Sequence, residues 1–81
     1  MTDEVKKEIL TTQKKLNILY TRSKARSRRG FAKFIGMSVP TTIYWLNGQR
    51  KPSLKAIRMI QKAFMRRFNV EVPIEDIITE E

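Results

Sequence analysis

The sequence contains neither cysteine nor histidine among its 81 residues. Without cysteine the chain has no disulfide and no thiolate metal ligand, and without histidine it lacks the commonest metal ligand and the commonest general acid or base. All eight carboxylate side chains lie outside residues 14–68, and no nucleophile stands beside a base. We therefore expect no catalytic residue, no metal site and no cofactor, and we predict that the protein is not an enzyme.

Long hydrophobic runs are also absent. The longest stretch of consecutive apolar residues is four, at residues 43–46, whereas a helix needs about 20 to span a bilayer. The first residues do not combine a basic start with an apolar core, as a secretory signal does. We therefore expect a cytoplasmic protein.

The middle of the chain has no acidic side chain. Residues 14–68 hold fifteen Lys or Arg residues and no Asp or Glu, so the net charge of +9 understates a central charge of +15. Double-stranded DNA carries one phosphate charge per ~1.7 Å of helix axis, and cations that neutralise those charges release bound counterions. The expected partner is a polyanion.

A chain of 81 residues makes one small domain with room for four or five helices. Apolar spacing and cap signals predict an all-α domain, residues 1–81, with helices at 3–21, 28–35, 39–47 and 54–68. A basic connector, Arg22–Arg29, joins the first two helices. In the last helix, the predicted apolar stripe consists of Leu54, Ile57, Ile60, Phe64 and Phe68.

Small residues mark where the helices begin and end. Thr2 or Asp3 can cap the first helix, and Ser27, Ser38 and Ser53 can cap the other three. Gly36 follows the second helix at the position where a left-handed residue ends many helices. Two short helices are thereby predicted to meet at a tight turn within residues 28–47.

The acidic, aliphatic tail, residues 69–81, has two readings. Val70, Val72 and Ile74 alternate with other residues as in a strand, whereas Pro73 followed by residues 74–78 is typical of the start of a short helix. The sequence leaves open a short C-terminal strand or helix. We expect the tail to pack against the domain.

Two short helices joined by a glycine turn have the plan of a helix-turn-helix. The stretch FAKFIGMSVPTTIYWLNGQRKPS, residues 31–53, resembles the lambda repressor/Cro-like (XRE-type) helix-turn-helix family. The matching residues are the small Ala32, the turn residues Gly36 and Met37, the cap Ser38, the ending Trp45, Leu46, Asn47 and Gly48, and the basic loop Arg50, Lys51, Pro52 and Ser53. The resemblance implies a lambda-repressor-like domain whose second short helix reads the major groove.

Two features depart from the family pattern. Thr42 stands where the family has an aliphatic core residue, with Ile43 one place later, and the connector before Ser27 is more basic and one residue longer. The first departure leaves the rotation of the recognition helix open by about one residue, or 100° around its axis.

The start and one side of the recognition helix carry the expected base contacts. They are Ser38, Val39, Pro40, Thr41 and Tyr44. Hydroxyl groups can hydrogen-bond base edges and methyl groups can meet the thymine methyl, although Val39 and Pro40 could instead only shape the start of the helix. We assign Trp45 to the core, because Ile43 and Trp45 cannot both be exposed in a small stable domain.

Basic and amide side chains around this helix carry the expected phosphate contacts. Arg28 and Arg29 open the second helix, whose N-terminus favours an anion. Asn47, Gln49, Arg50 and Lys51 lie at and beyond the end of the recognition helix. Lys24 and Arg26 could reach the DNA backbone or the minor groove, or lie in a solvated loop.

The leading hypothesis is a small transcriptional regulator of the repressor type found in phages, plasmids and mobile elements, binding specific double-stranded DNA and associated with the nucleoid. The family commonly binds palindromes as dimers, and residues 3–21 or the tail could form the dimer surface. An antitoxin would add a protein partner bound through the acidic tail. A general RNA- or DNA-binding protein would use Arg22–Arg29, and a protein-interaction module would bind an acidic partner.

Overall fold

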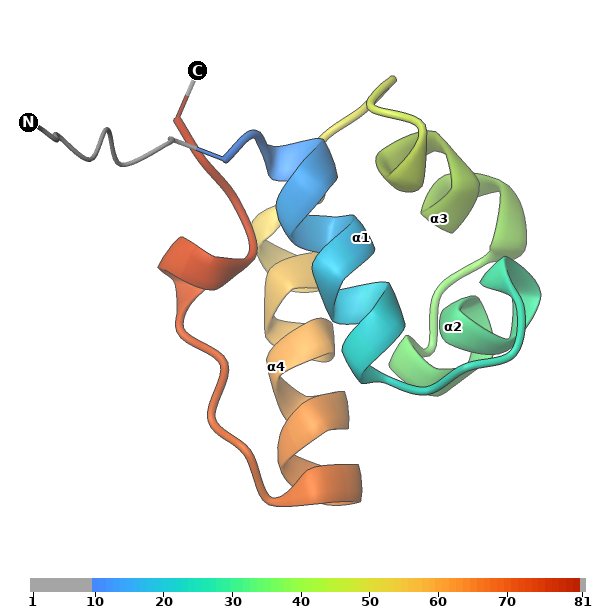
Figure 1. Ribbon diagram of the computed structural model, residues 1–81, viewed down its shortest axis with the longest axis vertical. Coiled ribbons are helices and arrows are strands. Elements are labelled where there is room, and N and C mark those ends of the chain that lie inside the picture. The colour runs from blue at the N-terminus through green and yellow to red at the C-terminus, as the bar shows by residue number, and fades with distance from the viewer. Residues whose placement is uncertain (1–9, 81) are drawn as a thin grey trace, which may run out of the picture.

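The computed structural model describes residues 10–80, which form four α-helices and a short 3₁₀ helix. The helices are α1 Thr12–Arg22, α2 Arg28–Ile35, α3 Val39–Leu46, α4 Leu54–Phe68 and the 3₁₀ helix Ile74–Asp76. In Figure 1, α1 runs across the front of the molecule, α2 and α3 lie to its right, and α4 stands behind it. No strand occurs within residues 10–80, so the predicted all-α fold is confirmed.

Three of the predicted helix caps form as expected. Ser27, Ser38 and Ser53 have extended backbone, and the side chain of each accepts a hydrogen bond from the N–H three residues later. Each serine thus satisfies one of the N–H groups that the first turn of a helix leaves without a partner. These caps fix the starts of α2, α3 and α4 at the residues the sequence indicates.

The predicted start of the first helix was wrong. The caps Thr2 and Asp3 lie outside the described residues, but Thr11, inside the predicted helix 3–21, is extended (φ −73°, ψ 163°) and caps a helix that begins at Thr12. The Thr11 side chain accepts a hydrogen bond from the N–H of Lys14 at 3.2 Å. Because an N-cap residue has non-helical backbone, α1 cannot continue unbroken through Thr11.

The core lies where α1, α2 and α4 meet and is rich in aromatic side chains. Phe31 is fully buried and packs near Tyr20, with ring centroids 5.5 Å apart. Phe34 of α2 meets Phe64 of α4 edge-on at 5.1 Å. Trp45 is buried, which confirms its assignment to the core.

The predicted apolar stripe of α4 holds except at its first residue. Ile57, Ile60 and Phe64 are buried, but Leu54 is 59% exposed and Phe68 is partly buried. On an ideal helix Leu54 lies about one third of a turn from Ile60, which turns its side chain away from the core. Two alanines, Ala56 and Ala63, are buried as well, and their small side chains allow α4 to lie close to its neighbours.

The tail folds back along α4. Of the two structures that the sequence left open, it forms the short helix, and its described part contains no strand. Asn69 adopts the left-handed conformation (φ 56°) and ends α4, after which the chain reverses and returns beside α4 towards the start of α1 (Figure 1). Val72 and Ile77 are buried, whereas Val70 and Ile74 are exposed. The expectation that the tail packs is confirmed.

Polar contacts fasten the tail to α1 and α4. The N–H of Thr79 donates to the Thr12 hydroxyl at 2.9 Å, and the Lys15 ammonium donates to the carbonyls of Glu75 and Ile78. The Gln61 amide donates to the Val72 carbonyl at 2.9 Å. The tail is therefore part of the domain. None of the helices in residues 10–80 is long and apolar enough to cross a membrane.

Candidate nucleic-acid interface

The turn between α2 and α3 depends on Gly36. Its φ of +81° is left-handed, and its N–H donates to the carbonyls of Ala32 and Lys33 at 2.9 and 3.2 Å. A Cβ atom on Gly36 would come within 3.1 Å of the Met59 side chain. Glycine is therefore favoured here both by backbone conformation and by the close approach of α4, and this turn sets α3 against α2.

The rotation of α3, which the sequence leaves open, follows from burial. Thr42 is 0% exposed, and Trp45 and Leu46 are also buried. The Thr42 hydroxyl donates to the Ser38 carbonyl at 3.0 Å, so a buried polar group at this position is satisfied within the helix itself. Thr42 therefore takes the core position, and Ile43 is only partly buried.

The opposite side of α3 faces outward and carries the predicted base contacts. Pro40 is exposed, Tyr44 is 37% exposed, and Val39 and Thr41 are half-buried. The Ser38 hydroxyl donates to Thr41 Oγ1 at 2.8 Å while accepting from the Thr41 N–H at 3.4 Å. Ser38 is thus engaged as a cap, whereas the Thr41 hydroxyl proton is left for an external acceptor.

Tyr44 holds Arg50 beside this outer face. The guanidinium carbon of Arg50 lies 4.7 Å from the centre of the Tyr44 ring. Guanidinium groups are attracted to the faces of aromatic rings, and the N–H of Gln49 donates to the Tyr44 carbonyl at 2.9 Å. The basic loop after α3 is therefore ordered next to the residues predicted to read bases.

Two side chains of α1 secure the other end of α3. The amide groups of Gln13 and Asn17 both donate to the Leu46 carbonyl, at 3.2 and 3.0 Å. Gln13 also fills the space beside Gly48, where a Cβ atom would lie 2.7 Å from Gln13 Oε1. These positioning residues could not be predicted from the sequence, because nothing in the spacing of α1 signals a contact with a residue about thirty positions away.

The predicted phosphate contacts lie in two exposed groups. Asn47, Gln49, Arg50 and Lys51 are exposed in the loop after α3, and Arg28 and Arg29 are exposed at the start of α2. The N–H groups of Arg28 and Arg29 have no helical acceptor because these residues open the helix. Both groups therefore offer cations, and the second adds unpaired N–H groups from a helix N-terminus.

Lys24 and Arg26 lie in the connector between α1 and α2. Arg26 is exposed, and its predicted phosphate contact stays a prediction. Lys24 has a left-handed backbone (φ 61°) and lies beside Phe68 and Val70 at the groove between α1, α4 and the tail. The structure thus brings Lys24 together with the tail, which lies across α1 from α3 in Figure 1.

Comparison with known proteins adds no assignment. No family model, curated protein or solved structure matches the chain.

Proposed function

We propose that the protein binds double-stranded DNA sequence-specifically and acts as a small transcriptional regulator, reading the major groove with α3. One observation carries the proposal: α3 buries one side through Thr42, Trp45 and Leu46, while its other side is exposed between cationic segments. The major groove of B-DNA is ~12 Å wide and admits an α-helix. A helix presented in this way is suited to that groove.

The exposed side chains of α3 offer the contacts that base edges accept. The Thr41 hydroxyl can donate to a purine N7 or to a carbonyl oxygen, and the Val39 methyl groups can meet a thymine methyl. The Tyr44 ring adds a larger apolar surface with a hydroxyl at its tip. Together these groups can discriminate between base pairs, which contacts to the backbone phosphates do not.

The cations around α3 supply the contacts that do not depend on sequence. Arg28 and Arg29 at the start of α2, and Arg50 and Lys51 after α3, would each neutralise backbone phosphates and position α3 in the groove. No acidic residue between positions 14 and 68 opposes them. In this proposal the charge provides affinity and α3 provides specificity.

The resemblance to the lambda repressor/Cro-like family supports a repressor that binds a palindrome as a dimer, with half-sites about one helical turn apart. The proposal is tested by selecting the purified protein on a random double-stranded DNA library at ~150 mM salt, where purely electrostatic binding is weak. We expect enrichment of an inverted repeat. Binding without any enriched motif would instead favour a general nucleic-acid-binding protein.

A further inference from the structure

A second candidate site lies on the part of the molecule that carries the tail. A groove with a volume of about 310 Å³ runs between the ends of α1 and α4 and the chain that follows α4. Its lining residues are Leu19, Phe64, Phe68, Val70 and Val72, with Arg22 and Lys24. Small-molecule sites begin at about 300 Å³ and combine mostly apolar walls with few polar groups, so this groove is suited to a small ligand.

The two cations of the groove have no partner in the described part of the chain. Within residues 10–80, neither the Arg22 guanidinium nor the Lys24 ammonium makes a hydrogen bond or an ion pair. Among residues 10–80, no carboxylate lines the groove. An apolar groove with two unpaired cations complements a molecule that has an apolar body and an anionic head.

The backbone at Lys24 is unusual as well. Its φ of +61° is left-handed, a conformation that costs free energy for a residue with a side chain and that is concentrated at functional sites. The N–H of Lys24 donates to the Thr21 carbonyl at 3.1 Å, which fixes the turn directly after α1. The strained residue thus places a cation at the rim of the groove.

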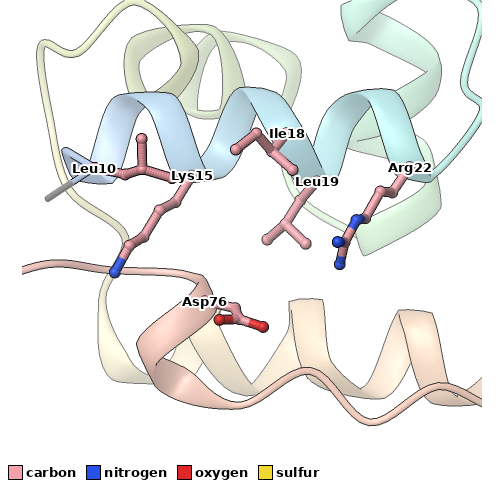
Figure 2. A pocket seen from close by; sticks show the side chains of 6 residues that line it. All are labelled: Leu10, Lys15, Ile18, Leu19, Arg22 and Asp76. Atoms are coloured by element: carbon pink, nitrogen blue, oxygen red, sulfur yellow. The ribbon is translucent and has the colours of Figure 1, made fainter. Parts of the chain in front are cut away.

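One carboxylate lies nearby, in the neighbouring pocket that shares Leu19 and Arg22 with the groove. Figure 2 shows Asp76 of the 3₁₀ helix on the same side of α1 as Arg22. Asp76 makes no ion pair with Arg22 in the structure, but its charge opposes an incoming anion. Replacing the Asp76 carboxylate by an amide would therefore test whether the groove binds an anion.

We propose that this groove binds a soluble amphiphilic carboxylate, such as a medium-chain fatty acid, with the chain against Phe64, Phe68 and Val70 and the carboxylate at Arg22 and Lys24. The lining residues of the groove come from α1, α4, the connector after α1 and the tail, and the tail lies across α1 from α3 in Figure 1, so ligand binding here does not depend on DNA binding. Its failure and the failure of the proposed function are therefore distinguishable by direct ligand binding in the absence of DNA.

The test uses octanoate, titrated into the full-length protein by calorimetry and by amide chemical-shift mapping, with 1-octanol as the uncharged counterpart. We expect saturable octanoate binding, weaker 1-octanol binding, and shifts concentrated at Lys24, Val70 and Val72. The double variant Arg22→Gln/Lys24→Gln should weaken octanoate about tenfold, since each exposed charge pair supplies a factor of up to about five. The equally charged control Lys55→Gln/Arg58→Gln, on α4 outside the groove, should bind as the unmodified protein does.

Two single variants sharpen the test. Val70→Glu, at a side chain 45% exposed and therefore tolerant of substitution, should abolish binding by placing a carboxylate in the groove. Asp76→Asn should tighten octanoate by a factor of about two through loss of a nearby like charge.

Several results would overturn the proposal. They are equal affinity for octanoate and 1-octanol, unchanged affinity in the Arg22→Gln/Lys24→Gln variant, no saturation below about 10 mM, and binding to anionic vesicles without binding to free octanoate. A dimer that Val70→Glu converts to a monomer, with no effect of octanoate, would show that a second copy covers the groove.

Discussion

Thr42 is the residue of α3 that departs from the pattern of the lambda repressor/Cro-like family, which the sequence resembles. Its methyl group fills a fully buried site, and its hydroxyl donates to the Ser38 carbonyl, which also accepts the Thr42 N–H at 3.1 Å. Removing the hydroxyl therefore leaves no polar group unsatisfied. The threonine contributes chiefly through packing.

Thr42→Val should consequently change the free energy of unfolding by less than about 1 kcal/mol, because shape is kept and a buried hydroxyl is exchanged for a methyl group. Thr42→Ala should destabilise the protein by about 1–2 kcal/mol, since it leaves a small cavity. Chemical denaturation followed by the fluorescence of Trp45 measures both. A loss for Thr42→Val as large as that for Thr42→Ala would show that the hydroxyl, not the packing, matters.

Two glycines allow a matched comparison of backbone roles. Gly36→Ala should cost about 1–2 kcal/mol, because φ is +81° there and a Cβ atom would lie 3.1 Å from the end of the Met59 side chain, which would have to shift slightly. Gly30→Ala should stabilise the protein by about 0.5–1 kcal/mol, since Gly30 lies inside α2 and its Cβ would meet only ordinary contacts at 3.5 and 3.7 Å. Thermal unfolding by circular dichroism distinguishes them. Equal effects of the two substitutions would contradict the role assigned to the turn.

At the scale of the helices, α3 is held in place from α1. The Leu46 carbonyl, at the end of α3, accepts hydrogen bonds from Gln13 and Asn17. Each of these bonds brings a side-chain donor to a carbonyl at the end of a helix, where no N–H of the same helix is available as a donor. The position of α3 should therefore depend on α1 as well as on the turn at Gly36.

The double variant Gln13→Ala/Asn17→Ala should lose about 1–2 kcal/mol of stability, at the ordinary net value of a hydrogen bond. It should also weaken sequence-specific DNA binding without changing the net charge. Lys14→Ala, on the exposed side of the same helix, serves as the stability control. Unchanged stability and DNA affinity in the double variant would show that these bonds do not position α3.

The sequence predicts the helix boundaries well where the signal is local. Ser27, Gly36, Ser38 and Ser53 act within three or four residues of themselves, so their roles can be deduced from spacing alone. Contacts between distant residues could not be predicted in this way. The Thr12 and Thr79 hydrogen bond and the bonds from Gln13 and Asn17 to Leu46 join positions far apart in the chain.

In the candidate site, too, local features could be predicted from the sequence and contacts between distant residues could not. The exposed positions of α3 and its cationic flanks follow from the residues that match the family, whereas the rotation at Thr42 needed the fold. The prediction that Leu54 belongs to the buried stripe of α4 was wrong, because helical spacing does not show how far along the helix the core extends. Lys24 could not be placed beside Val70, since the path of the tail was left open by the sequence.

At the scale of the whole molecule, the tail completes the core of an otherwise very small domain. Ile77, directly after the 3₁₀ helix, is 0% exposed, whereas Ile74, the first residue of that helix, is 43% exposed. Ile77→Ala should destabilise the protein by about 2–4 kcal/mol, but Ile74→Ala by less than about 1 kcal/mol. Denaturant titration of the two variants measures both changes in the free energy of unfolding. Similar small losses in both variants would mean that the tail does not contribute to the core.

The most direct test of base reading by α3 compares variants on two duplexes. The affinities of the unmodified protein, Tyr44→Ala, Thr41→Ala and Arg28→Ala would be measured by fluorescence anisotropy for the selected sequence and for a scrambled one, at several salt concentrations. We expect Tyr44→Ala and Thr41→Ala to reduce the preference for the selected sequence by about 1–3 kcal/mol. We expect Arg28→Ala to weaken binding to both duplexes alike and to lower the salt slope by about one. Equal losses on both duplexes from the two α3 variants would contradict base reading by α3.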